Sequence, residues 1–143
     1  MKYIKARTTR LMLDYFNHDN RRIEHALSVL FEAERLMLEE SISCDHAIVV
    51  VAALLHDIGI KVSEEKLGYN NGKTQEEYGP PVAGELLESI NFPGEKIAIV
   101  KEIIANHHSP SRHDYPELEI LKRADRIVNI NEKNINNEGD YHD

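Results

Sequence analysis

Nine consecutive apolar residues, Ala47 to Leu55, are followed directly by a histidine and an aspartate in the stretch AIVVVAALLHDIG. A helix without a polar face is buried on all sides, so this run predicts the central helix of a helical core. We expect Asp45 to cap its start, His56 and Asp57 to lie at its end, and Gly59 to stop it. A carboxylate at the negative end of a helix is unfavourable, and burial adds to that cost unless a cation or hydrogen-bond donors compensate. Asp57 therefore needs a partner.

The composition is that of an ordinary globular protein. At 143 residues, with 41% apolar and 29% charged residues, the chain can form one domain around one core. Its apolar runs are shorter than a membrane span, and its first residues lack the continuous apolar stretch of a signal peptide. Cys44 is the one cysteine, which excludes an internal disulfide and leads us to expect the reducing cytoplasm. The net charge of −8 argues against a surface that coats nucleic acid.

Helical spacing of apolar residues recurs along the chain, and no segment alternates as a strand would. We expect an all-α, compact bundle of about six helices, with residues 1–131 as one domain and residues 132–143 as a polar, frayed tail. The expected helices cover about residues 3–16, which extend the bundle at its N-terminus, and 21–40, 46–57, 80–90, 95–108 and 117–130. A polar, glycine-containing loop is expected over residues 61–79. Pro80 and Pro81 suit the first turn of the helix that follows this loop.

A second carboxylate is also placed against the core. Asp125 shares a helix face with Leu121, Ala124 and Val128, so it lies on the inward stripe. An unpaired carboxylate in that position is costly. The simplest alternative to a functional role is a salt bridge to a neighbouring cation of the same helix: Lys122, Arg123 or Arg126.

Three histidines accompany these two acids. His107 and His108 end the IIANHH stretch, where both follow Ile103 and Ile104 at helical spacing and can point inward. His25 lies one turn into its helix, at the edge of the apolar face. Taken singly, the inward pair is most simply explained as hydrogen-bonded core histidines, and His25 as a histidine at the solvent edge.

Taken together, these residues suggest a metal site. The imidazoles of His25 and His56 and the carboxylates of Asp57 and Asp125 come from three helices, each placed against the core. A divalent cation would neutralise both buried acids and accept the imidazole nitrogens as ligands. Mixed nitrogen and oxygen ligation suits Mn, Fe, Co, Ni or Zn.

The ordered set H…HD…D resembles the signature of the HD superfamily of metal-dependent phosphohydrolases, in the subtype whose motif reads HDIG. The resemblance spans about residues 21–131 and includes AALLHDIG, the NHH helix end and the ILKRADRI helix. It implies an all-α bundle with a metal near its centre. The ligands that it implies are His25, His56, Asp57 and Asp125.

The same resemblance implies hydrolysis of a phosphate mono- or diester, such as a nucleotide, by a metal-activated water. Asp57 would also accept a proton from the attacking water. His107 and His108 would stabilise charge on the phosphate or protonate the leaving oxygen. Three cations near the ligands are candidates for binding the phosphate: Arg22, Lys61 and Arg112. Lys61 is also a candidate for catalysis.

Two of the departures from the HD pattern bear on the number of metals and on the catalytic lysine. Relatives with two metals often carry a histidine where this chain has Pro80, in PPVAGELL, so we favour one tightly bound ion. His107 and His108 could hold a second ion, with Asp57 as the bridge. Some relatives have a catalytic lysine directly after HDIG, whereas Lys61 here lies one residue later.

Other interpretations of the chain differ in the class of function. HD-type relatives with two irons oxidise their substrates with molecular oxygen, and a small HD protein could be a non-catalytic module that binds a ligand. A plain helical protein could instead pair the four residues without a metal. The expected partner is a small phosphorylated molecule rather than a membrane, and a homodimer is compatible with the sequence. We interpret Arg21 as a solvated surface charge and Arg126 as a member of a structural ion pair.

Overall fold

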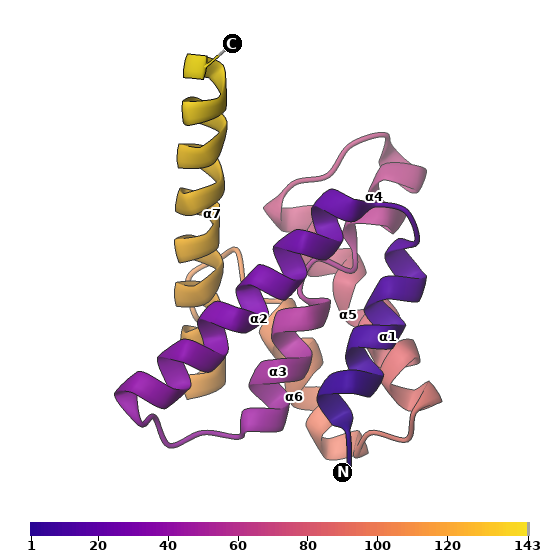
Figure 1. The fold of residues 1–143 in the computed structure, drawn as a ribbon. Coiled ribbons are helices and arrows are strands. Elements are labelled where there is room, and N and C mark those ends of the chain that lie inside the picture. The colour runs from indigo at the N-terminus through magenta and orange to yellow at the C-terminus, as the bar shows by residue number, and fades with distance from the viewer. Residues whose placement is uncertain (143) are drawn as a thin grey trace.

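The computed structural model describes the backbone of residues 1–142 and the side chains of residues 1–135. Within that range the fold is entirely helical, which confirms the predicted all-α bundle (Figure 1). Seven helices, one more than expected, follow one another: α1 (Ile4–Phe16), α2 (Asn20–Glu40), α3 (His46–Leu55), α4 (Ile60–Leu67), α5 (Gly72–Ser89), α6 (Gly94–Ile104) and α7 (Pro116–His142).

Helix α3 is the centre of the bundle. All its residues from Ile48 to Leu55 are buried, and it packs against α1, α2, α6 and α7. The Asp45 side chain accepts a hydrogen bond from the backbone N–H of Ile48 at 3.2 Å, which is the predicted N-cap. The apolar run therefore occupies the position expected of a helix that lacks a polar face.

The HDIG motif is the turn between two helices rather than the last turn of one. Helix α3 ends at Leu55, and α4 begins at Ile60. A side chain on Gly59 would meet backbone atoms of Tyr78 and Gly79 at 2.5 to 2.9 Å. Glycine is needed here because α5 crosses the turn too closely for a β-carbon, and this contact holds the motif against α5.

The segment expected to be a loop, residues 61–79, is mostly helical. Helix α4 fills its first part, and α5 begins at Gly72 rather than at Pro80. The early start has a local cause, because Asn71 and Thr74 form a reciprocal capping box in which each side chain accepts the other's backbone N–H. Pro80 and Pro81 consequently lie inside α5, where they remove two helical hydrogen bonds.

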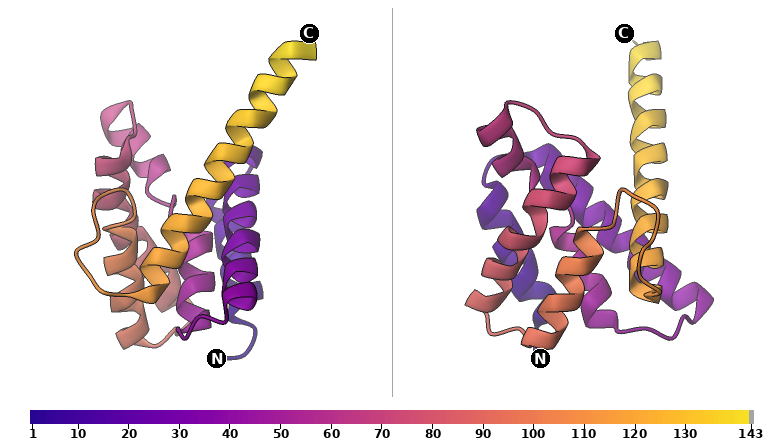
Figure 2. Two further views of the ribbon diagram at one scale, coloured as in Figure 1. Left: turned by 90° about the vertical axis from the view of Figure 1, so that its left-hand side faces the viewer. Right: turned by 180° about the vertical axis from the view of Figure 1, so that it is seen from behind.

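Helix α7 packs across α2 at an angle and extends past the other helices at its C-terminal end (Figure 2). It continues beyond residue 131, where we placed the end of the domain, so Glu132 belongs to the same helix as Asp125. The side chains of residues 136–143, in the expected frayed tail, lie outside the described residues. The domain boundary stays a prediction.

One stretch, His46–Leu67, is long and apolar enough to cross a membrane by length and composition alone. Its most apolar window is 72% buried inside the bundle. Packing in the protein core accounts for this hydropathy.

Candidate metal centre

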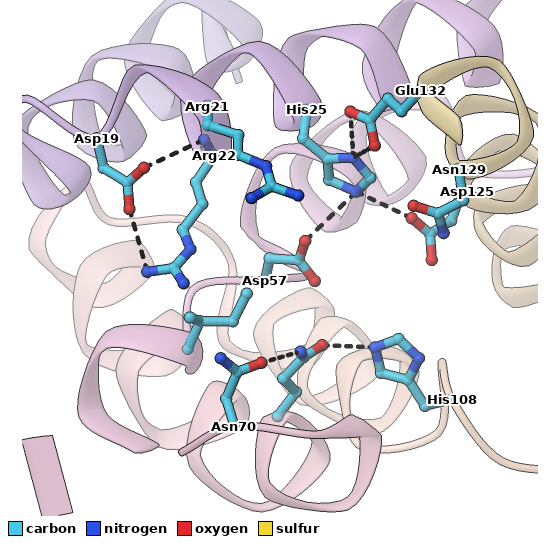
Figure 3. Close-up of a pocket in the computed structure, with 12 residues that line it drawn as sticks. Asp19, Arg21, Arg22, His25, Asp57, Asn70, His108, Asp125, Asn129 and Glu132 are labelled. Atoms are coloured by element: carbon cyan, nitrogen blue, oxygen red, sulfur yellow. Dashed lines mark hydrogen bonds and ion pairs between the residues drawn. The ribbon is translucent and has the colours of Figure 1, made fainter. Parts of the chain in front are cut away.

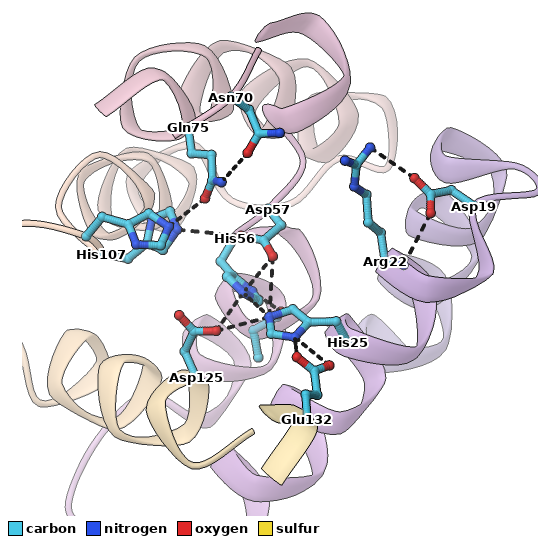
Figure 4. Close-up of polar contacts among 12 residues, drawn as sticks. Asp19, Arg22, His25, His56, Asp57, Asn70, Gln75, His107, Asp125 and Glu132 are labelled. Atoms are coloured by element: carbon cyan, nitrogen blue, oxygen red, sulfur yellow. Dashed lines mark hydrogen bonds and ion pairs between the residues drawn. The ribbon is translucent and has the colours of Figure 1, made fainter. Parts of the chain in front are cut away.

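Three helices bring the predicted ligands to one place. His25 comes from α2, His56 and Asp57 from the turn after α3, and Asp125 from α7 (Figure 4). His107 approaches the same place from the turn that follows α6. The side chains of His25, Asp57 and Asp125 are only 11 to 15% exposed, and His56 is completely buried.

The same local device orients two of the histidines. His56 Nδ1 donates to the carbonyl of Ala53 at 2.7 Å, and His107 Nδ1 donates to the carbonyl of Ile104 at 2.6 Å. Each acceptor belongs to the last turn of a helix, where carbonyls lack intrahelical donors. These bonds assign the Nδ1–H tautomer to both neutral imidazoles and leave both Nε2 lone pairs free for the centre.

A carboxylate on α7 does the same for the third histidine. His25 Nδ1 lies 3.0 and 3.1 Å from the two carboxylate oxygens of Glu132. Because a carboxylate only accepts, Nδ1 is the donor and Nε2 is directed toward Asp57 and Asp125. A histidine held by a carboxylate in this way is typical of metal sites.

The inner nitrogen and oxygen atoms lie at or near hydrogen-bond distance from one another. His25 Nε2 lies 3.0 Å from Asp125 Oδ1, 3.4 Å from Asp57 Oδ2 and 3.4 Å from His56 Nε2. His56 Nε2 lies 3.4 Å from both carboxylates. Two lone pairs of neutral imidazoles facing each other between two carboxylates require a cation or protons among them. Ligand atoms of His25, His56 and Asp125 lie within 4.8 Å of one another, so this cluster could hold a metal ion.

Asp57, His107 and His108 form a second cluster of the same dimension. Asp57 faces the first cluster with Oδ2 and lies 3.8 Å from His107 Nε2 with Oδ1. His107 Nε2 is buried without a hydrogen-bond partner, and a buried polar atom in that state costs free energy. The geometry is that of a carboxylate shared between two adjacent ligand sets.

A chain of amides orients His108. Its Nε2 lies 2.5 Å from Gln75 Oε1, Gln75 Nε2 donates to Asn70 Oδ1 at 2.9 Å, and Asn70 Nδ2 donates to Glu64 Oε2 at 2.9 Å. The Glu64 carboxylate can only accept, which sets the direction of every bond in the chain. His108 Nε2 is therefore the donor to Gln75, and Nδ1 keeps the free lone pair of the neutral ring.

The electrostatics of the metal-free centre follow from these contacts. Burial lowers the pKa of His56, but the charge of Asp57 and the hydrogen bond with Asp125 outweigh it and raise the pKa to about 9. Burial raises the pKa of Asp57, while His56 and His107 lower it to about 2. The pKa of Asp125 is also lowered, since its bonds with His25 and His56 outweigh its burial. Without a metal, the acids hold protons on the imidazoles.

The centre opens into a cavity of about 570 Å³ (Figure 3). Its wall includes His25, Asp57, His108 and Asp125, so both ligand clusters are accessible from it. Arg21 also lines the cavity, and its exposed guanidinium lies beside His25. Arg21 is exposed, as expected of a solvated charge, but it also borders the cavity.

None of the three cations predicted to bind phosphate is free in the cavity: each lies outside it or is bonded to another group of the protein. Lys61 is exposed, with its Nζ 5.4 Å from the ring centre of Tyr15, and it does not line the cavity. Arg112 donates to the carbonyl of Ala105 at 3.0 Å and so closes the end of α6. Arg22 lines the cavity, but its guanidinium makes two bonds to Glu64, at 2.9 and 3.0 Å. It ties α2 to α4, and its charge is already compensated.

Two residues of the centre were missed in the sequence. Glu132 lies seven residues after Asp125, which places both on one helix face, but we had assigned it to the tail. Gln75 lay in the expected loop, and no local pattern marks it. Arg126, expected in an ion pair, is exposed and makes none with the side chains that the structure describes.

Comparisons with known proteins agree with this geometry. The HD domain family matches residues 22–130. An uncharacterised protein of Clostridium beijerinckii is 30% identical over 108 residues, which cover 76% of this chain and 64% of that protein. The crystal structure of a predicted HD superfamily hydrolase from an uncultured Thermotogales bacterium aligns with a TM-score of 0.64 at 28% identity, over 83% of this chain and 64% of that one. The chain thus spans 64% of the length of both relatives.

Proposed function

The chain belongs to the HD domain family, and we propose that it is a metal-dependent phosphohydrolase acting on a small phosphate ester. The observation that carries the proposal is the convergence of three imidazole Nε2 atoms on two carboxylates, with Nδ1 of each ring held by a protein acceptor. Rings held in this way offer Nε2 to a cation without reorganisation.

The residues present fit a divalent transition metal. His25, His56, Asp57 and Asp125 supply mixed nitrogen and oxygen ligands, as Mn, Fe, Co, Ni or Zn prefer. The buried Nε2 of His107 would find its missing partner in a second ion shared through Asp57. Such a metal supplies a water of lowered pKa and polarises a phosphoryl oxygen. We propose one tightly bound ion in the first cluster, since Pro80 stands where two-metal relatives often carry a histidine.

The residues of the chain would orient the substrate and move the proton. Asp57 and His108 line the cavity, and both can accept a proton from an attacking water. The amide chain through Gln75 keeps the neutral His108 ring with its Nδ1 lone pair free. Arg21 replaces Arg22, Lys61 and Arg112 as the cation proposed to hold the phosphate, because it lines the cavity while the others are occupied or remote.

Two measurements test the proposal. Elemental analysis of protein purified without a metal-affinity tag reports the ion and its stoichiometry. A screen of phosphate mono- and diesters with added Mn²⁺, Co²⁺ or Ni²⁺ tests the reaction, with Asp57→Ala beside the matched variant Asp14→Ala, whose carboxylate is exposed on α1. We expect Asp57→Ala to lose metal and activity and Asp14→Ala to keep both. Equal activity of both variants, or the absence of any hydrolysed ester, would refute the proposal.

A further inference from the structure

A second cavity, of about 520 Å³, adjoins the centre on the side of α7. It shares His108, Asp125 and Asn129 with the first cavity, so the two meet at the ligand clusters. From its charge we propose that it binds a second phosphate group of the substrate, beyond the one that is hydrolysed. The identity of the bound molecule as a substrate rests on the proposed function.

The two cavities differ in charge. The second is lined by Lys122, Arg126 and Lys133 against one acid, Asp125. The first is lined by two arginines against four acids, and Glu64 and Asp19 already compensate one of those arginines. In a chain of net charge −8, three cations around one cavity are a local exception that favours an anionic ligand.

The three cations are available to a ligand. Lys122, Arg126 and Lys133 are spaced by four and seven residues on α7, which places them on one face of the helix. Arg126 and Lys133 are exposed and make no ion pair with the side chains that the structure describes. Lys122 Nζ donates to the carbonyl of Ser109 at 2.7 Å and to Ser111 Oγ at 2.6 Å, which are neutral acceptors. Its charge is thus positioned but not compensated.

This asymmetry would orient a substrate. The hydrolysed phosphate would lie at the centre, where the metal would offset the charges of Asp57 and Asp125. A second anionic end would be attracted by the cations of the second cavity, while a neutral organic part such as a nucleoside suits the polar side chains of the first, Asn70 and Gln75. The substrate class that fits both cavities is an organic molecule with two separate phosphate groups. A simple monophosphate would use only the centre and Arg21.

The test compares two nucleotides that differ by one phosphate. Binding of adenosine 3′,5′-bisphosphate and of adenosine 5′-monophosphate to the metal-loaded protein is measured by calorimetry, with phosphate release assayed in the recovered sample. If either nucleotide turns over, KM replaces Kd in the same comparison. We expect the bisphosphate to bind at least tenfold more tightly, and this ratio to fall toward one in the double variant Arg126→Gln/Lys133→Gln with its metal content unchanged.

Arg123→Gln is the matched control. Arg123 is an exposed arginine of the same helix, but it pairs with Glu40 at 2.9 Å on another face, so its loss should leave the ratio unchanged. Equal binding of the two nucleotides to the wild-type protein, or a preference that survives the double variant, would overturn the inference. Ester hydrolysis that depends on Asp57 but shows no such preference would support the proposed function and refute the second phosphate site. A preference for the bisphosphate without any hydrolysis would support the anion site and count against the proposed function.

Discussion

Metal affinity should rise steeply with pH, because the metal must displace a proton from His56. The Nε2 atom that faces Asp57 and Asp125 carries this proton in the metal-free protein, where the pKa is about 9. A nitrogen cannot hold the proton and the metal at once. For each displaced proton, the apparent metal affinity therefore falls tenfold with every pH unit below the pKa. At pH 7, two units below, the cost is about 2.7 kcal/mol for one proton.

Between pH 6 and pH 8 the apparent Kd for Co²⁺ should therefore fall about 100-fold. Burial lowers the pKa of His25, but its bonds with Asp125 and Glu132 and the charge of Asp57 together outweigh burial and raise it, and a second displaced proton would steepen the dependence. Competition with a chromogenic chelator of known pH dependence measures the Kd. Calorimetry in buffers of different ionisation enthalpy counts the released protons.

His18→Ala provides the matched control, because His18 is exposed in the turn between α1 and α2, belongs to neither ligand cluster and should not affect the slope. An affinity that stays constant across this pH range, or binding without proton release, would refute the reasoning. It would mean that the metal does not take the nitrogen that the two acids protonate.

Three further predictions concern the supports of the centre. Glu132→Gln should weaken metal binding about tenfold in chelator competition, because an amide holds His25 less firmly than a carboxylate. An unchanged affinity would show that Glu132 does not support the metal site. Gly59→Ala should lower the free energy of unfolding by about 1–3 kcal/mol in urea denaturation, because its β-carbon would clash with backbone. Gly94→Ala, with no neighbour within 4 Å, should change it by less than about 0.5 kcal/mol, and similar effects of both would contradict the packing argument. The free energy of unfolding of the metal-free protein should fall by about 3 kcal/mol as pH rises from 6.5 to above 9, because the folded state raises the pKa of His56 and the stabilisation ends when that proton leaves. A free energy of unfolding that does not change with pH in urea denaturation would show that the acids do not hold the proton.

Local patterns were sufficient for much of the fold. Helices α1 to α3 and the Asp45 cap follow from apolar spacing and cap residues near in sequence. The prediction of a loop from Lys61 to Gly79 was wrong. It rested on polar composition, whereas the Asn71 capping box and contacts with α6 hold α5 as a helix across two prolines.

Long-range contacts explain what the sequence could not show at the site. Of the four expected ligands, Asp57 and Asp125 could be found because a carboxylate placed against the core needs a partner, whereas His25 and His56 were added by their joint placement and by the resemblance to the HD pattern. Gln75 breaks no rule, since an amide in a polar segment is unremarkable until its bond to His108 is seen. Lys61 was misplaced because adjacency to a motif in sequence does not decide which way a side chain leaves a helix.

A network of protons alone does not account for this centre as well as a metal does. Protons on His25 and His56 would satisfy Asp57 and Asp125, as the raised pKa values of both imidazoles indicate. The same explanation is weaker at His107, whose Nδ1 is bonded to a helix carbonyl while its Nε2 is buried without a hydrogen bond, 3.8 Å from Asp57 Oδ1. A core histidine kept only for packing would not need both features. A cation that binds Nε2 next to a shared carboxylate uses both, so the orphaned atom of His107 favours the metal over the salt-bridge alternative.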